Sequence, residues 1–92
     1  MNKHDIERIE AKLQAVTGAL YPEQQRHILE KRATRLMLEL QDNALQLSNL
    51  VNEPSPARRK AIEQVVKADS EQICKELGEV QLLLDILENQ EF

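Results

Sequence analysis

The sequence predicts an all-α protein in which a short N-terminal helix packs on a long antiparallel helical hairpin. Of its 92 residues, 41% are apolar and 30% are charged, and Tyr21 and Phe92 are the only aromatic residues. Leucine, glutamate, glutamine, alanine, lysine and arginine are abundant, as is typical of helical bundles and coiled coils. Apolar residues recur at steps of three and four, and the runs that strands need are missing. A chain of this length indicates a single domain, residues 1–92.

The first predicted helix covers residues 5–17. Its apolar stripe consists of Ile6, Ile9, Leu13 and Val16. Gly18 is suited to ending this helix, because glycine adopts the left-handed backbone conformation that follows many helices. At 1.5 Å per residue the helix is about 20 Å long, so we expect it to cover only part of the hairpin, beside residues 22–38.

Two longer helices, residues 22–52 and 56–88, are predicted to form the hairpin. Pro22 suits the first position of a helix, where its missing N–H has no partner to lose. The apolar seam expected on the second helix is Leu29, Ala33, Leu36, Leu40, Ala44, Leu47 and Val51. The seam expected on the third helix is Ile62, Val66, Ile73, Leu77, Val80, Leu84 and Leu87.

Pro54 and Pro56 predict a turn at residues 53–55 between these two helices. Glu53 and Ser55 each precede a proline, which pushes both out of helical geometry. Ser55 can then cap a new helix that starts at Pro56. Because the turn is short, the second and third helices should be antiparallel neighbours.

Polar residues are predicted to help align the two long helices. Asn43 and Asp69 fall within the seams at about the same level, which we interpret as a polar layer that fixes register. The alternative is an aspartate with an altered pKa and a chemical role. Arg32 and Glu76, at the edge of the seam, are predicted to form an ion pair between the helices.

Several apolar residues point away from the seams and are candidates for an interface. At about 100° per residue, Leu38 and Leu45 lie almost opposite the seam of their helix. The predicted contact residues for a dimer or for the helix of another protein are Leu38, Leu45, Leu82, Ile86, His27 and Gln41. The alternative is that these are isolated surface residues, or that the first helix covers them.

Three cations, Arg58, Arg59 and Lys60, lie in the first turn of the third helix, where the helix dipole disfavours positive charge. One interpretation is that Asp42 and Glu53 compensate them within the hairpin. The other is that they contact an acidic protein or a phosphate backbone.

The sequence carries no recognisable motif for catalysis, cofactor binding or metal binding. A glycine-rich phosphate loop, an H-E-x-x-H and a C-x-x-C are all missing, and neither histidine has a ligand partner at helical spacing. The single Cys74 is expected to be a small buried apolar residue beside the seam. A lone cysteine and a charged N-terminal segment indicate the cytoplasm, and no apolar run reaches the roughly 20 residues that span a bilayer.

We therefore expect a non-enzymatic interaction protein without cofactors: a small cytoplasmic adaptor, chaperone or regulator that forms a homodimer and offers an apolar helix face to a partner helix. In layout the predicted hairpin resembles the small helical chaperones and regulators of bacterial secretion systems and phages, which implies a bacterial or phage protein. The alternative is a dimeric hairpin regulator that binds RNA or DNA through Arg58, Arg59 and Lys60. The net charge of -4 and the scarcity of aromatic residues argue against that alternative.

Overall fold

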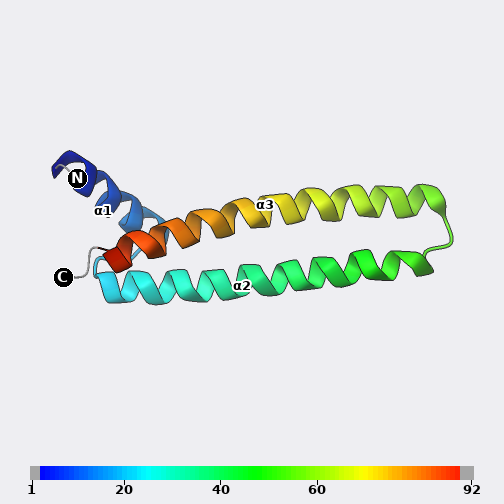
Figure 1. Ribbon diagram of the computed structural model, residues 1–92, viewed down its shortest axis with the longest axis horizontal. Helices are drawn as coiled ribbons and strands as arrows, with labels where there is room; N and C mark the ends of the chain where they lie inside the picture. Colours follow the sequence, from blue (N-terminus) through cyan, green and yellow to red (C-terminus); the bar gives the residue numbers. More distant parts are fainter. Residues whose placement is uncertain (1–2, 90–92) are drawn as a thin grey trace.

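The computed structural model describes residues 3–89 and confirms the predicted all-α fold. Its elements are α1 (Lys3–Thr17), α2 (Pro22–Ser48), the 3₁₀ helix η1 (Asn49–Asn52) and α3 (Pro56–Asn89). The long helices α2 and α3 run antiparallel, side by side, and give the molecule an elongated shape of 58 × 21 × 20 Å (Figure 1). The described part of the chain contains no strand.

Gly18 ends α1 as the sequence predicts. Its backbone has a φ of 70°, in the left-handed region that favours glycine. The Gly18 N–H donates a hydrogen bond of 2.8 Å to the Gln14 carbonyl, which satisfies one of the free acceptors at the helix end. The chain can therefore turn sharply into the segment that precedes Pro22.

At the turn between α2 and α3, the second helix ends and the third begins at Pro56 as predicted, with one difference. Ser55 caps α3, because its Oγ accepts a hydrogen bond of 3.3 Å from the Arg58 N–H. The prediction that the second helix continues to residue 52 is wrong in detail: the α-helix ends at Ser48, and residues 49–52 form a tighter 3₁₀ turn. Such a turn is a common way for a helix to end.

The core is a seam of aliphatic side chains between α2 and α3. Its buried members are Leu29, Ala33, Leu36, Ile73, Val80, Leu83 and Leu87, and Leu13 of α1 packs in the same cluster. Toward the end of α2 the seam differs from the prediction, because Ala44 is exposed and Val51 is 80% exposed. Asn43 is buried and Leu50 is half-buried in their place.

The steps between seam residues explain this difference. The predicted series contains two successive steps of four residues, from Leu36 to Leu40 and from Leu40 to Ala44. Two such steps in a row move the stripe sideways around the helix, away from the neighbouring helix. The observed series alternates four and three, and this repeat of 3.5 residues keeps a seam facing a neighbouring helix that coils around it. The same repeat on α3 buries Leu83, whereas the predicted seam residue Leu84 is half-buried.

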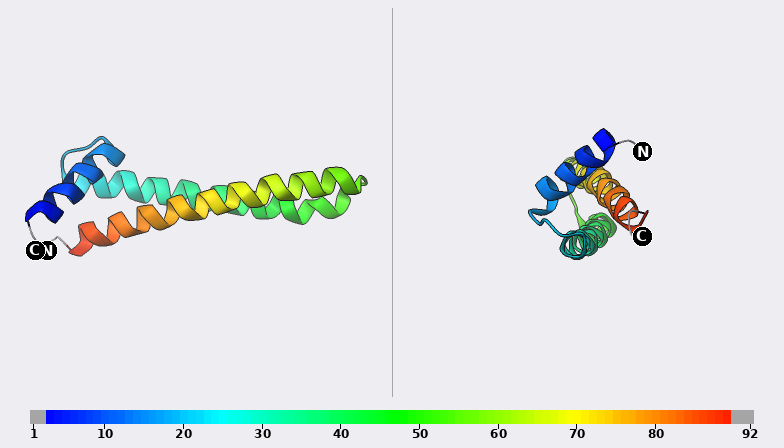
Figure 2. Two further views of the ribbon diagram at one scale, coloured as in Figure 1. Left: turned by 90° about the horizontal axis from the view of Figure 1, so that it is seen from above. Right: turned by 90° about the vertical axis from the view of Figure 1, so that its left-hand side faces the viewer.

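The first helix packs at one end of the hairpin only. Figures 1 and 2 show α1 beside the start of α2 and the end of α3, far from the turn. Leu13 is 1% exposed and joins the core, and the buried Gln25 side chain donates a hydrogen bond of 2.9 Å to the Ala19 carbonyl. The expectation that this short helix covers only part of the hairpin is therefore confirmed.

Candidate interaction surfaces

An uncharged strip runs along α2 between Thr34 and Ser48. It consists of Thr34, Met37, Leu38, Gln41, Ala44, Leu45 and Ser48, which we call the back strip. All seven residues are exposed, Leu38 by 59% and Leu45 by 61%. At 100° per residue their side chains share one side of the helix, about 120° wide, turned away from the seam. The charged residues of this stretch lie outside that sector.

The back strip includes three of the predicted interface residues and two apolar residues, Met37 and Ala44, that were not among them. Leu38, Gln41 and Leu45 are exposed as expected. Met37 and Ala44 belong to the same surface, and the signal that identifies them is their spacing of three and four residues from Gln41.

The remaining predicted interface residues lie outside the back strip. His27 is exposed two turns before Thr34, where the strip begins, and lines a small depression with Ala19 and Ile28. Leu82 is exposed on α3, whereas Ile86 is half-buried and offers less surface than the prediction assumed. The structure thus concentrates the exposed apolar surface of the middle of α2 on the back strip.

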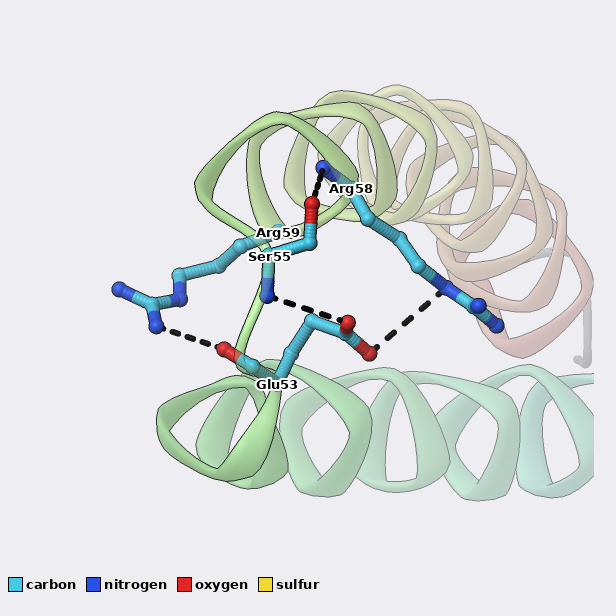
Figure 3. Close-up of polar contacts among 4 residues, drawn as sticks. All are labelled: Glu53, Ser55, Arg58 and Arg59. Atoms are coloured by element: carbon cyan, nitrogen blue, oxygen red, sulfur yellow. Dashed lines mark hydrogen bonds and ion pairs between the residues drawn. The ribbon is translucent and has the colours of Figure 1, made fainter.

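Glu53 contacts two residues of the cationic tip, which we define as Arg58, Arg59 and Lys60. Figure 3 shows its contacts with Arg58 and Arg59. Its carboxylate lies 3.6 Å from Nε of Arg58, and its backbone carbonyl accepts a hydrogen bond of 2.6 Å from the Arg59 guanidinium. The interpretation that Glu53 compensates these charges within the hairpin is therefore confirmed for Arg58, the one cation of the tip that its carboxylate pairs with in the described chain.

No ion pair joins Asp42 to these cations in the described chain, and its carboxylate accepts a hydrogen bond of 3.0 Å from Gln46. Two turns beyond the tip, Lys67 Nζ lies 2.6 Å from a carboxylate oxygen of Glu63. This hydrogen bond and the positive charge lower the pKa of Glu63, so the pair persists to a lower pH than a free glutamate would allow.

A polar layer crosses the seam at Asn43. Its Nδ2 donates hydrogen bonds of 2.8 Å to Oδ2 of Asp69 and 3.2 Å to Oγ of Ser70. The prediction that Asn43 and Asp69 lie level with one another is confirmed. The predicted ion pair is wrong, because no such contact joins Arg32 and Glu76 in the described chain.

Cys74 is exposed, which corrects the expectation of a buried thiol. The alternating repeat places Ile73 in the seam, and the next residue therefore points outward. Within residues 3–89, no group of three or more His, Cys, Asp or Glu side chains could hold a metal ion. None of the helices in this described part has the length and apolar character needed to cross a bilayer.

Comparison with known proteins adds no family to these observations. No protein-family model matches the chain, and neither a curated protein nor a solved structure gives a significant match. Inferences about function therefore depend on the surfaces of the hairpin itself.

Proposed function

We propose that this protein acts by protein–protein interaction, with the back strip of α2 as its surface for binding a helix. The observation that carries the proposal is the exposure of Leu38 and Leu45 within a surface that has no charge over four turns. Apolar side chains at steps of three and four residues on one side of a helix are what a second helix packs against. Each Å² of apolar surface removed from water there contributes about 25 cal/mol.

The hairpin presents this strip on a rigid support. α2 packs against α3 along the hairpin, and the bonds of Asn43 to Asp69 and Ser70 fix the level at which the two helices meet. A surface that is already ordered loses little conformational freedom on binding, which favours affinity. This arrangement suits an adaptor, a chaperone or a regulator that assembles with helices.

Binding of RNA or DNA through the cationic tip has less support. The Glu53 carboxylate pairs with Arg58, which reduces the positive potential that a phosphate backbone requires. The net charge of -4 opposes such binding further. Tyr21 is the only aromatic residue in the described chain, so stacking of bases has little support as well.

Native mass spectrometry of the protein isolated gently from its own host tests this proposal. The natural chain is compared with Leu38→Glu/Leu45→Glu, which adds two charges to the back strip. The matched control is Val65→Glu/Leu82→Glu, which adds the same charges at apolar residues on α3 that are 70% and 59% exposed.

We expect a bound polypeptide, a second copy included, on the natural chain and on the control, and none on the strip variant. Burying a carboxylate without a partner in an apolar contact costs several kcal/mol. Equal retention of the polypeptide by all three chains would contradict the proposal. Recovery of bound RNA or DNA instead would support the alternative function.

A further inference from the structure

We infer that the back strip binds a second copy of this chain, with the two α2 helices antiparallel and a two-fold axis at Gln41. The inference rests on the proposed function, because it names the occupant of the same strip. Two independent features of α2 support it: the symmetry of the strip and the distribution of charge along the helix.

The back strip is symmetric about Gln41. Residues at equal distances on its two sides form the pairs Thr34 and Ser48, Met37 and Leu45, and Leu38 and Ala44. In a two-fold interface, residue i contacts residue j of the other copy and j contacts i, so each pair forms twice. Hydroxyl then faces hydroxyl, and each large side chain faces an apolar partner.

The centre of the strip is compatible with this axis. Gln41 faces Gln41 of the second copy, and its amide carries both donors and an acceptor. The two amides can therefore hydrogen-bond to one another. In a parallel dimer, by contrast, Leu38 faces Leu38 and Ala44 faces Ala44. Two large side chains then meet at one level and two small ones at another, so the helices pack unevenly.

Charge along α2 favours the same direction. Residues 22–38 contain four cations, Arg26, Lys31, Arg32 and Arg35, and two acids, Glu23 and Glu30, which gives a net charge of +2. Residues 39–53 contain three acids, Glu39, Asp42 and Glu53, and no cation, which gives -3. With the axis at Gln41, antiparallel helices place the cations of residues 22–38 beside residues 44–53 of the other copy, which carry a single charge, the acid Glu53. Parallel helices place like charges together, which is unfavourable.

The size of the strip predicts how strong the dimer is. A stable interface typically involves about 20 to 30 residues from each partner. The back strip supplies seven, with a few neighbours at its ends. We therefore expect a dimer that dissociates on dilution, which makes protein concentration a variable of the experiment.

Disulfide trapping tests the direction of the two helices. In a Cys74→Ser background, which removes the exposed native thiol, one chain carries Thr34→Cys and another carries Ser48→Cys. The antiparallel dimer brings position 34 of one copy next to position 48 of the other. In a parallel dimer these positions are about 21 Å apart along the axis, whereas a disulfide needs Cα atoms within about 7 Å.

The two chains are mixed in a glutathione buffer at several protein concentrations, and the disulfide-linked products are quantified by intact mass spectrometry. Light scattering gives the oligomeric state, and circular dichroism checks that the chains are folded. We expect the mixed disulfide to exceed either homodisulfide about tenfold, because only it satisfies the geometry of a disulfide.

Three outcomes would overturn the inference. Predominant homodisulfides mean a parallel dimer, a statistical mixture of products means no defined pairing, and a monomer at every concentration means that the second copy does not bind. In each case the proposed function is tested separately, by whether the natural chain isolated from its host retains a bound polypeptide in native mass spectrometry.

Discussion

Asn43 lies in the seam between α2 and α3, toward the end of α2. It is buried, and it donates hydrogen bonds to Asp69 and Ser70 on the opposite helix. Asp69 itself is exposed, so its carboxylate keeps contact with water while it accepts the bond. The layer therefore fixes the level at which the helices pair without the cost of a fully buried charge.

Replacing Asn43 with Asp should make the stability of the hairpin depend on pH. The variant places two carboxylates side by side, which raises the pKa of the pair above the value in the unfolded chain. At neutral pH the free energy of unfolding should fall by about 1 to 3 kcal/mol. The loss should disappear as pH falls through the raised pKa, because one carboxyl then becomes protonated and can donate a hydrogen bond.

Urea unfolding at neutral and mildly acid pH checks this prediction, with Asn43→Leu as the control. The leucine variant keeps the seam apolar, and its difference in stability from the natural chain should not change with pH. A loss for Asn43→Asp that is the same at both pH values would show that the two carboxylates do not interact.

The polar layer and the Ser55 cap could be predicted from the sequence because local geometry determines them. The level of Asn43 and Asp69 follows from counting residues from the turn, and the cap follows from the prolines around Ser55. The ion pair predicted between Arg32 and Glu76 is absent from the described chain. Long charged side chains at the edge of a seam have many conformations in water, and pairing gains little there.

At the scale of elements, α1 is attached to the hairpin mainly through Leu13. This side chain is 1% exposed, and Ile9 packs against the same core. The apolar stripe of α1 predicted these contacts, and its length predicted that it covers one end only. The sequence did not predict how α1 crosses the hairpin, because a stripe of four residues fits several crossing angles.

Replacing Leu13 with Ala should release α1 and leave the hairpin folded. Truncating a fully buried leucine costs about 2 to 5 kcal/mol, and a short helix with one buried anchor cannot lose that much and stay docked. Amide hydrogen exchange of residues 3–17 should become fast, while α2 and α3 near Asn43 and Ile73 keep their protection.

Val16→Ala is the control for this experiment, because Val16 lies on the same helix and is exposed. It should leave exchange in α1 nearly unchanged. Loss of protection throughout α2 and α3 in the Leu13 variant would mean that the hairpin depends on α1 and does not fold independently of it.

At the scale of the whole molecule, the protein is a rod with three helices at one end and two at the other (Figure 1). α1 leaves the back strip uncovered, since all its residues are exposed. The spacing of Leu38 and Leu45 predicted an apolar back surface. The sequence did not predict the full extent of this surface. The seam runs through Asn43 and not through Ala44, so Ala44 is exposed and becomes part of the back strip.

Sedimentation equilibrium of the purified chain tests most directly whether the back strip is a surface for binding helices. We expect one monomer–dimer equilibrium shared by the natural chain and Val65→Glu/Leu82→Glu. Leu38→Glu/Leu45→Glu should sediment as a monomer with unchanged helical circular dichroism, because the added carboxylates would be buried in the contact. Dimers of the strip variant as stable as those of the natural chain would contradict the account.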